Sequence, residues 1–137
     1  VSTPCATTHG ILRAMSHDRT SAASIELPDG APMSEYQRYI DRLEAMHGWD
    51  SVDLVNNCFL LGEEIGELFK AIRRHNKMFE QSGANPLSKE ESVKQVGEEL
   101  VDCMNYLLAL ANRVGVDMES AFRDKNARNQ QRRWDGA

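Results

Sequence analysis

The chain has 137 residues and carries 21 acidic against 16 basic side chains, which gives a formal net charge of −5. This length fits one domain with a real core, although so small a domain gains stability by associating with further copies. The negative charge argues against a binder of nucleic acid polymers or anionic membranes. No apolar run approaches the roughly 20 residues that a membrane-spanning helix needs.

The cellular compartment is indicated by the N-terminus and the cysteines. The N-terminus lacks the basic and then apolar pattern of a signal peptide, so we expect a cytoplasmic protein. The three cysteines, Cys5, Cys58 and Cys103, are an odd number without the spacing of a metal site. Cys58 and Cys103 lie in apolar runs with helical periodicity, which predicts buried and reduced thiols.

Residues 1–32 differ in composition from the rest of the chain. They are rich in Ser, Thr, Ala, Gly and Pro and show no sustained periodicity. This composition is typical of a disordered or loosely attached arm. We therefore expect the folded domain over residues 33–137.

Two helices are predicted in the first half of the domain. The stretch from Ser34 to Gln37 has the spacing of a capping box and opens a first helix that ends near Gly48. An apolar stripe at helical spacing supports this helix: Tyr36, Tyr39, Ile40, Leu43 and Met46. Asp50 or Ser51 is expected to cap a long second helix, which continues to about Met78.

Two further helices follow a loop. Residues 80–87 contain the turn-forming residues of a loop, and residues 88–91 have the spacing of a second capping box. The third helix is expected to end at Gly115, and Asp117 is expected to cap a fourth that runs to about Arg133. Neither strand-like alternation nor an internal repeat occurs in the sequence. The prediction is an all-α domain of four helices.

The second and third predicted helices each carry a pair of acids inside an apolar run. Glu64 and Glu67 are three residues apart, with Glu63 beside them, and Glu99 and Asp102 are also three apart. Residues at this spacing lie on the same face of a helix. The apolar neighbours predict that the second helix is largely buried. Burying an ionised carboxylate costs several kcal/mol, so a positive charge must compensate these acids.

The positions of the two acidic motifs predict one shared site. If the second and third helices form an antiparallel hairpin, the four acids lie at nearly the same height, since each residue adds about 1.5 Å. Packed helix axes lie about 8–10 Å apart, which lets facing carboxylates converge on one cation. Oxygen ligands alone suit Mg²⁺, with Mn²⁺ as a substitute, and do not suit zinc. A di-iron site is disfavoured, because no histidine stands three residues after one of these acids.

The acidic motifs stand in order with other polar and aromatic residues: Trp49, Asn56, Glu63, Glu64, Glu67, Glu99, Asp102, Tyr106, Lys125, Asn129 and Arg132. This order resembles the MazG-like all-α nucleoside triphosphate pyrophosphohydrolases, and most closely the branch of dCTP pyrophosphatases and dimeric dUTPases. The resemblance covers about residues 35–134. Two departures bear on substrate choice: the loop between the acidic motifs is somewhat long, and Asn105 replaces an aliphatic residue.

The resemblance implies a role for each of these residues. Glu64, Glu67, Glu99 and Asp102 would ligate the metal, and Glu63 would be an additional ligand or orient the attacking water. Phosphate contacts would come from the last helix, unless its residues form a solvated face: Lys125, Asn129 and Arg132. A pocket for the base and sugar would use four residues, of which the two aromatic ones could equally pack in the core: Trp49, Asn56, Asn105 and Tyr106.

The resemblance also implies an activity. The enzyme would use Mg²⁺ to convert a nucleoside or deoxynucleoside triphosphate and water into the monophosphate and pyrophosphate, in nucleotide pool sanitation or balance. Two alternatives remain open, a non-catalytic helical oligomerisation module and a phosphoribosyl-ATP pyrophosphohydrolase of the same fold. Wide apolar arcs on the second and third helices predict a homodimer or homotetramer that completes the bundle around this central pair.

Overall fold

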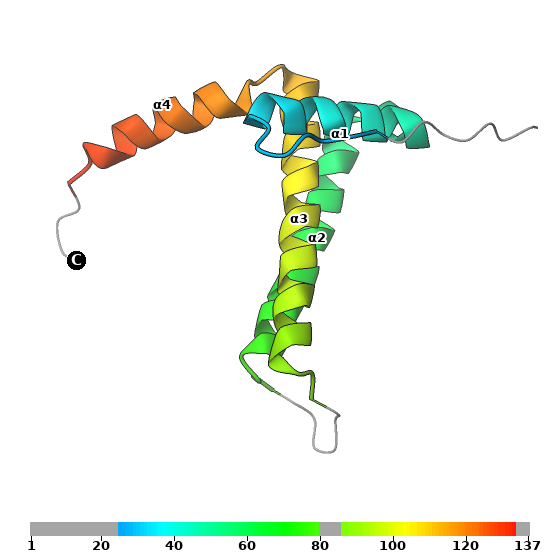
Figure 1. Ribbon diagram of the computed structural model, residues 1–137, viewed down its shortest axis with the longest axis vertical. Coiled ribbons are helices and arrows are strands. Elements are labelled where there is room, and N and C mark those ends of the chain that lie inside the picture. Colours follow the sequence, from blue (N-terminus) through cyan, green and yellow to red (C-terminus); the bar gives the residue numbers. More distant parts are fainter. Residues whose placement is uncertain (1–24, 80–85, 134–137) are drawn as a thin grey trace, which may run out of the picture.

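The computed structural model describes residues 25–79 and 86–133, which form four α-helices, one short 3₁₀ helix and no strand. The elements follow in this order: α1 (Met33–His47), η1 (Trp49–Ser51), α2 (Leu54–His75), α3 (Lys89–Val114) and α4 (Met118–Gln130). Helices α2 and α3 form a long antiparallel hairpin, α1 crosses its open end, and α4 projects away from it (Figure 1). The prediction of an all-α fold is confirmed.

The start of α1 differs from the prediction, whereas its end agrees. Pro32 is the N-cap, and its carbonyl accepts a hydrogen bond from the N–H of Glu35 at 2.9 Å. Ser34 therefore lies inside the first turn, and the capping box predicted there is wrong. Gly48 ends the helix as expected, with a φ of 73° that glycine adopts without strain.

The start of α2 also lies later than predicted. Asp53 is its N-cap, in place of Asp50 or Ser51, because residues 49–51 are already folded into η1. The carboxylate of Asp53 accepts hydrogen bonds from two backbone N–H groups of the first turn, at 2.9 and 3.0 Å. This satisfies two of the donors that a helix start leaves without partners.

The end of α2 comes before the expected Met78, at His75. Lys77 donates its N–H to the carbonyl of Arg74 at 3.0 Å, and Met78 donates to that of Arg73 at 2.9 Å. This pair of bonds is a Schellman motif, which usually has glycine at the position that Lys77 occupies with a φ of 52°. The usual glycine signal is therefore missing, and only weaker signals mark this end, namely the basic residues of the last turn and Asn76 after it.

Both ends of α3 agree with the prediction. Ser88 and Glu91 form the expected capping box, and Gly115 ends the helix with a φ of 71°. Asp117 caps α4 by accepting a hydrogen bond from a backbone N–H at 3.0 Å, and the helix ends at Gln130, slightly early. Most of the predicted arm (residues 1–24), most of the predicted loop (80–85) and residues 134–137 lie outside the described residues. Residues 25–32 contain one turn and no helix or strand.

The core lies where α1 crosses α3. Ile40, Leu108 and Ala109 are at most 4% exposed. Six half-buried side chains pack around them: Met33, Tyr36, Tyr39, Leu43, Met104 and Met118. This small core fixes the angle between α1 and the hairpin, and so it shapes the space between them.

Beyond this crossing, the hairpin is covered on neither side by another described helix (Figure 1). Large apolar side chains on its surface are more than half exposed: Val55, Phe59, Phe69, Val93, Leu100 and Val101. The expectation that α2 is largely buried is therefore wrong for a single chain. Cys103 is buried as expected, but Cys58 is exposed, because it lies on this uncovered surface of α2. The predicted oligomer stays a prediction.

Candidate active site

Three acids meet across the hairpin, about halfway along it. One carboxylate oxygen from each of Glu64, Glu99 and Asp102 lies within 4.8 Å of the other two. Glu64 and Glu99 are half-buried, and Asp102 is exposed. Among the described residues of α1, α2 and α3, no Lys or Arg forms an ion pair with these three carboxylates. We call this group the acidic trio.

The other two predicted acids lie close to the trio without joining it. The carboxylate of Glu67 accepts a hydrogen bond from the ammonium group of Lys70 at 2.8 Å, and its side chain is 52% exposed. Glu63 is exposed as well. In this structure Glu67 is paired with Lys70 and is not part of the trio.

The surroundings of Glu64 disfavour its ionised form. Burial raises the pKa of Glu64 above its usual value, and the charges of Asp102, Glu99, Glu63 and Glu67 raise it further, in that order. A cation between the three carboxylates would oppose this shift, since a nearby positive charge favours the ionised form. The chemistry of the donor set, three carboxylate oxygens, fits Mg²⁺ or Mn²⁺.

A pocket of about 330 Å³ lies beside the trio, between α1, η1 and the hairpin. Its acidic end contains Glu64 and Asp102. Three of the four residues predicted for a base and sugar pocket line it: Trp49, Asn105 and Tyr106. Most of the remaining wall is apolar, including Ile40, Leu43, Leu60 and Ala109. Such a pocket, apolar with a few polar groups, is typical of a small-molecule site.

The two aromatic residues present different groups to the pocket. Trp49 is 52% exposed and stacks on His47, with ring centroids 4.4 Å apart. Tyr106 is half-buried, and its pKa is raised first by burial and then by the charges of Glu64 and Asp102. The phenol of Tyr106 therefore stays protonated at neutral pH and can donate a hydrogen bond.

Asn56, the fourth predicted pocket residue, does not line the pocket. Its side-chain amide donates to the carboxylate of Asp53 at the start of α2. The next residue, Asn57, lines the pocket and is only 1% exposed. The spacing could have identified it, because Asn57 stands seven residues, or two turns, before Glu64 and so on the same face.

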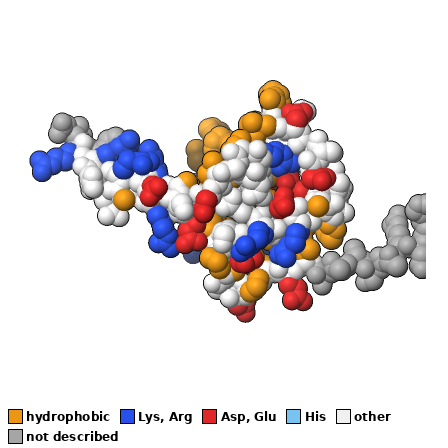
Figure 2. Space-filling view, turned by 90° about the horizontal axis from the view of Figure 1, so that it is seen from above, with side chains coloured by type: hydrophobic (Ala, Val, Ile, Leu, Met, Phe, Trp, Pro, Cys, Tyr) orange, Lys and Arg blue, Asp and Glu red, His pale blue; other side chains and the backbone are white. Residues whose placement is uncertain are grey.

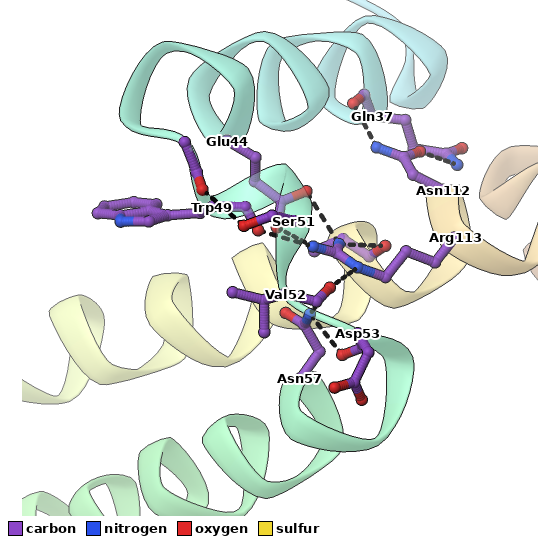
Figure 3. A network of polar contacts seen from close by, with 11 residues as sticks. Gln37, Glu44, Trp49, Ser51, Val52, Asp53, Asn57, Asn112 and Arg113 are labelled. Carbon is purple, nitrogen blue, oxygen red and sulfur yellow. Dashed lines mark hydrogen bonds and ion pairs between the residues drawn. The ribbon is translucent and has the colours of Figure 1, made fainter.

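Sequence reasoning also missed Arg113 and Glu44, which are joined in a buried ion pair (Figure 3). Two nitrogens of Arg113 donate to the two carboxylate oxygens of Glu44, each at 2.9 Å. Its nitrogens also donate to the carbonyls of Val52 at 2.9 Å, Trp49 at 3.2 Å and Ala109 at 3.1 Å. Arg113 thus fixes the wall of the pocket that η1 provides. No local pattern pairs two residues so far apart in sequence.

The residues predicted to contact phosphates are not brought to the trio of the same chain. Lys125 and Asn129 belong to α4, which packs mainly on α1 and leaves the bundle, and Arg132 follows it (Figure 1). Basic side chains gather on this projecting segment (Figure 2), at the following positions: Arg123, Lys125, Arg128, Arg132 and Arg133. Asn129 donates to the side chain of Asn126 at 3.5 Å.

Comparison with known families agrees with this site. The sequence model of the MazG nucleotide pyrophosphohydrolase domain matches residues 56–135, which is more than half of the chain. The chain therefore belongs to the MazG family, whose members typically depend on a metal. No curated protein matches the sequence. Within the described residues, no helix has the length and apolar character to cross a membrane.

Proposed function

We propose that the protein is a Mg²⁺-dependent nucleoside triphosphate pyrophosphohydrolase. It would convert an NTP or dNTP and water into the monophosphate and pyrophosphate, and serve the sanitation or balance of the cytoplasmic nucleotide pool. The observation that carries the proposal is the acidic trio at one end of a mostly apolar pocket of about 330 Å³. Family membership supports the reaction class, the hydrolysis of a nucleotide phosphoanhydride.

The acids have distinct roles in this proposal. Glu64, Glu99 and Asp102 hold the cation, and Glu67 joins them once it leaves Lys70. Glu63 is an additional ligand or orients the attacking water. When bound, Mg²⁺ supplies positive charge to the phosphate oxygens and lowers the pKa of a water molecule. Mn²⁺ accepts the same oxygen ligands.

The pocket would receive the nucleoside. Trp49 offers a ring for stacking on a base, while Asn105 and Tyr106 offer polar groups to the base or sugar. The triphosphate then extends toward Glu64 and Asp102, which lie at one end of the pocket. The apolar walls exclude water from the nucleoside and leave the phosphates at the open, acidic end.

The phosphate contacts would come from a second copy of the chain. Lys125, Asn129 and Arg132 suit phosphate oxygens by their chemistry, but α4 points away from the trio of its own chain. The uncovered faces of the hairpin favour association, and Gly62 and Gly66 have open space where a Cβ would stand, so another helix can approach closely. A homodimer or homotetramer would bring the basic segment of one copy to the acidic site of another.

The proposal is tested with purified protein and a panel of the common ribo- and deoxyribonucleoside triphosphates. We expect release of pyrophosphate and monophosphate with Mg²⁺ and no release with EDTA. Separation of the products by ion-exchange chromatography identifies the bond that is broken. Phosphoribosyl-ATP belongs in the panel, because its selective hydrolysis would establish the histidine-synthesis enzyme of the same fold instead. If the folded protein releases no pyrophosphate from any of these compounds, the result would favour the alternative function, a non-catalytic oligomerisation module.

A further inference from the structure

Asn57 is the most deeply buried polar residue of the pocket wall, with 1% of its surface exposed. Its side-chain nitrogen Nδ2 donates to two backbone carbonyls, those of Val52 and Asp53, each at 3.0 Å (Figure 3). An amide nitrogen carries two hydrogens, so these bonds use its full donating capacity.

The orientation of the Asn57 amide is fixed by the same contacts. Turning the amide over would bring its oxygen against two carbonyl oxygens, and oxygens of this kind only accept. The carbonyl of Val52 cannot move away, since Arg113 donates its Nε to it at 2.9 Å and is itself held by Glu44. The oxygen Oδ1 of Asn57 therefore faces away from both carbonyls.

Oδ1 of Asn57 is left as an acceptor toward the pocket. Among the residues that the structure describes, none donates a hydrogen bond to Oδ1, and no fully buried side-chain nitrogen or oxygen lacks a partner. Oδ1 consequently reaches open space, and the pocket is the space that Asn57 lines. The pocket thus contains a positioned acceptor that cannot become a donor.

The position of Asn57 selects the part of the ligand that would meet it. Asn57 and Glu64 are two turns apart on one face of α2, which separates them by about 10 Å along the helix axis. Under the proposed function, the triphosphate lies at Glu64 and the sugar follows it. The base then lies at Asn57, next to the apolar side chains of Ile40 and Leu60.

We propose that Asn57 is a specificity-determining residue, whose Oδ1 accepts a hydrogen bond from an N–H donor on the edge of the substrate base. This inference rests on the proposed function. A base that presents an acceptor at this edge would leave two buried acceptors facing each other without partners, which is costly. The enzyme should therefore discriminate between bases of equal shape that exchange an amino group for a keto oxygen.

The test compares kcat/KM within two such pairs of 2′-deoxynucleoside triphosphates, cytosine with uracil and adenine with hypoxanthine. In the pair that fits the pocket, we expect the wild type to prefer one member by about 5- to 150-fold. Asn57→Leu removes the acceptor, and the preference should fall to within about threefold of equality. Asn76→Leu is the matched control and should keep the wild-type ratio, because Asn76 is exposed at the other end of α2 and does not line the pocket.

Folding of the variant is checked separately, since Asn57→Leu also loses the bonds to Val52 and Asp53. Circular dichroism melting and Mg²⁺-dependent pyrophosphate release show whether it folds. Asn57→Ser is the second variant, because a serine hydroxyl can still donate to the carbonyl four residues before it. We expect the same loss of preference with Asn57→Ser.

Two results would overturn the role of Asn57. One is a wild type that hydrolyses both members of each pair equally, a measurement that depends on no variant. The other is a folded Asn57 variant that keeps the wild-type ratio. A wild type that hydrolyses no triphosphate at all removes the proposed function itself, so the two failures are distinguishable.

Discussion

Asp102→Asn removes one negative charge from the acidic trio and leaves the shape of the side chain nearly unchanged. If the trio holds Mg²⁺, this variant loses a direct ligand, and its hydrolysis of nucleoside triphosphates should be abolished. Without metal, the variant should be as stable as the wild type or more stable, because it relieves repulsion between Asp102 and Glu64. A structural acid would behave differently, since its loss destabilises the protein with or without metal.

The size of the expected effect follows from binding linkage. Mg²⁺ at 100 times its Kd stabilises the wild-type fold by about 2.7 kcal/mol, which raises the Tm of a chain of this size by about 10 °C. Loss of a residue that only hydrogen-bonds a metal ligand weakens metal affinity by up to about 100-fold, and loss of a direct ligand should weaken it at least as much. The same Mg²⁺ concentration then equals the Kd of the variant and adds only about 0.4 kcal/mol, or 1–2 °C.

The assay is a thermal melt followed by circular dichroism, with EDTA and with increasing MgCl₂, for wild type and variant. Glu98→Gln is the matched control, because Glu98 adjoins Glu99 on α3, has a 58% exposed side chain and lies 3.6 Å from Lys94. This control makes the same change in charge and should keep the full Mg²⁺ response and the activity. Near-normal Mg²⁺-dependent hydrolysis by Asp102→Asn would refute the whole assignment of the metal site.

Three further predictions follow from the same structure. Because the pKa of Glu64 is raised in the folded state, the metal-free protein should lose stability as pH rises from 4.5 through that pKa. Glu64→Gln should flatten this part of a curve of Tm against pH. An unchanged curve would contradict the raised pKa of Glu64. Light scattering should give a dimer or tetramer at micromolar concentration. If two copies share each site, an equal mixture of the inactive variants Asp102→Asn and Lys125→Ala should recover about a quarter of wild-type activity. A monomer, or a mixture without activity, would count against shared sites. A chain that begins at Pro32 should fold and keep its activity, and a rate loss beyond about tenfold would mean that the arm covers the site.

Most helix ends at which a favourable residue type forms the cap were predictable, with the exception of Asp53, because η1 precedes it and moves the start of α2. Gly48 and Gly115 adopt the left-handed conformation that ends α1 and α3, and Ser88 and Asp117 cap α3 and α4 as their side chains predict. Prediction failed where the backbone used an unusual residue for the same geometry. Lys77 takes a left-handed conformation at the end of α2, and a lysine does not predict this conformation.

The helix face of each acid and its height along the hairpin were predictable, whereas several side-chain partners across helices were not. Spacing three residues apart placed Glu99 and Asp102 on one face, and the heights of the two motifs brought them opposite Glu64. The pairing of Glu67 with Lys70 follows a local signal, because the two residues are three apart on α2. The rotation of each helix and the choice of partners across helices are set instead by packing, which no local spacing records. The same limit applies to the ion pair of Glu44 with Arg113, which depends on how α1 crosses α3.

One end of the candidate site is built entirely by a single chain, whereas the other end lacks groups that the same chain does not provide. The end that we propose for the nucleoside is built by packing within the chain: α1 crosses α3, Arg113 donates to the carbonyls of Trp49 in η1 and of Val52 after it, and Asn57 also donates to that of Val52. The end that we propose for the phosphates has three carboxylates and, among the described residues of the hairpin and α1, no cationic partner for them, while the basic segment of α4 points elsewhere. Like charges of this density are unfavourable unless a cation is present. Substrate selection can therefore be a property of the single chain, whereas catalysis would depend on what arrives at its acidic end, a metal ion and the basic helix of another copy.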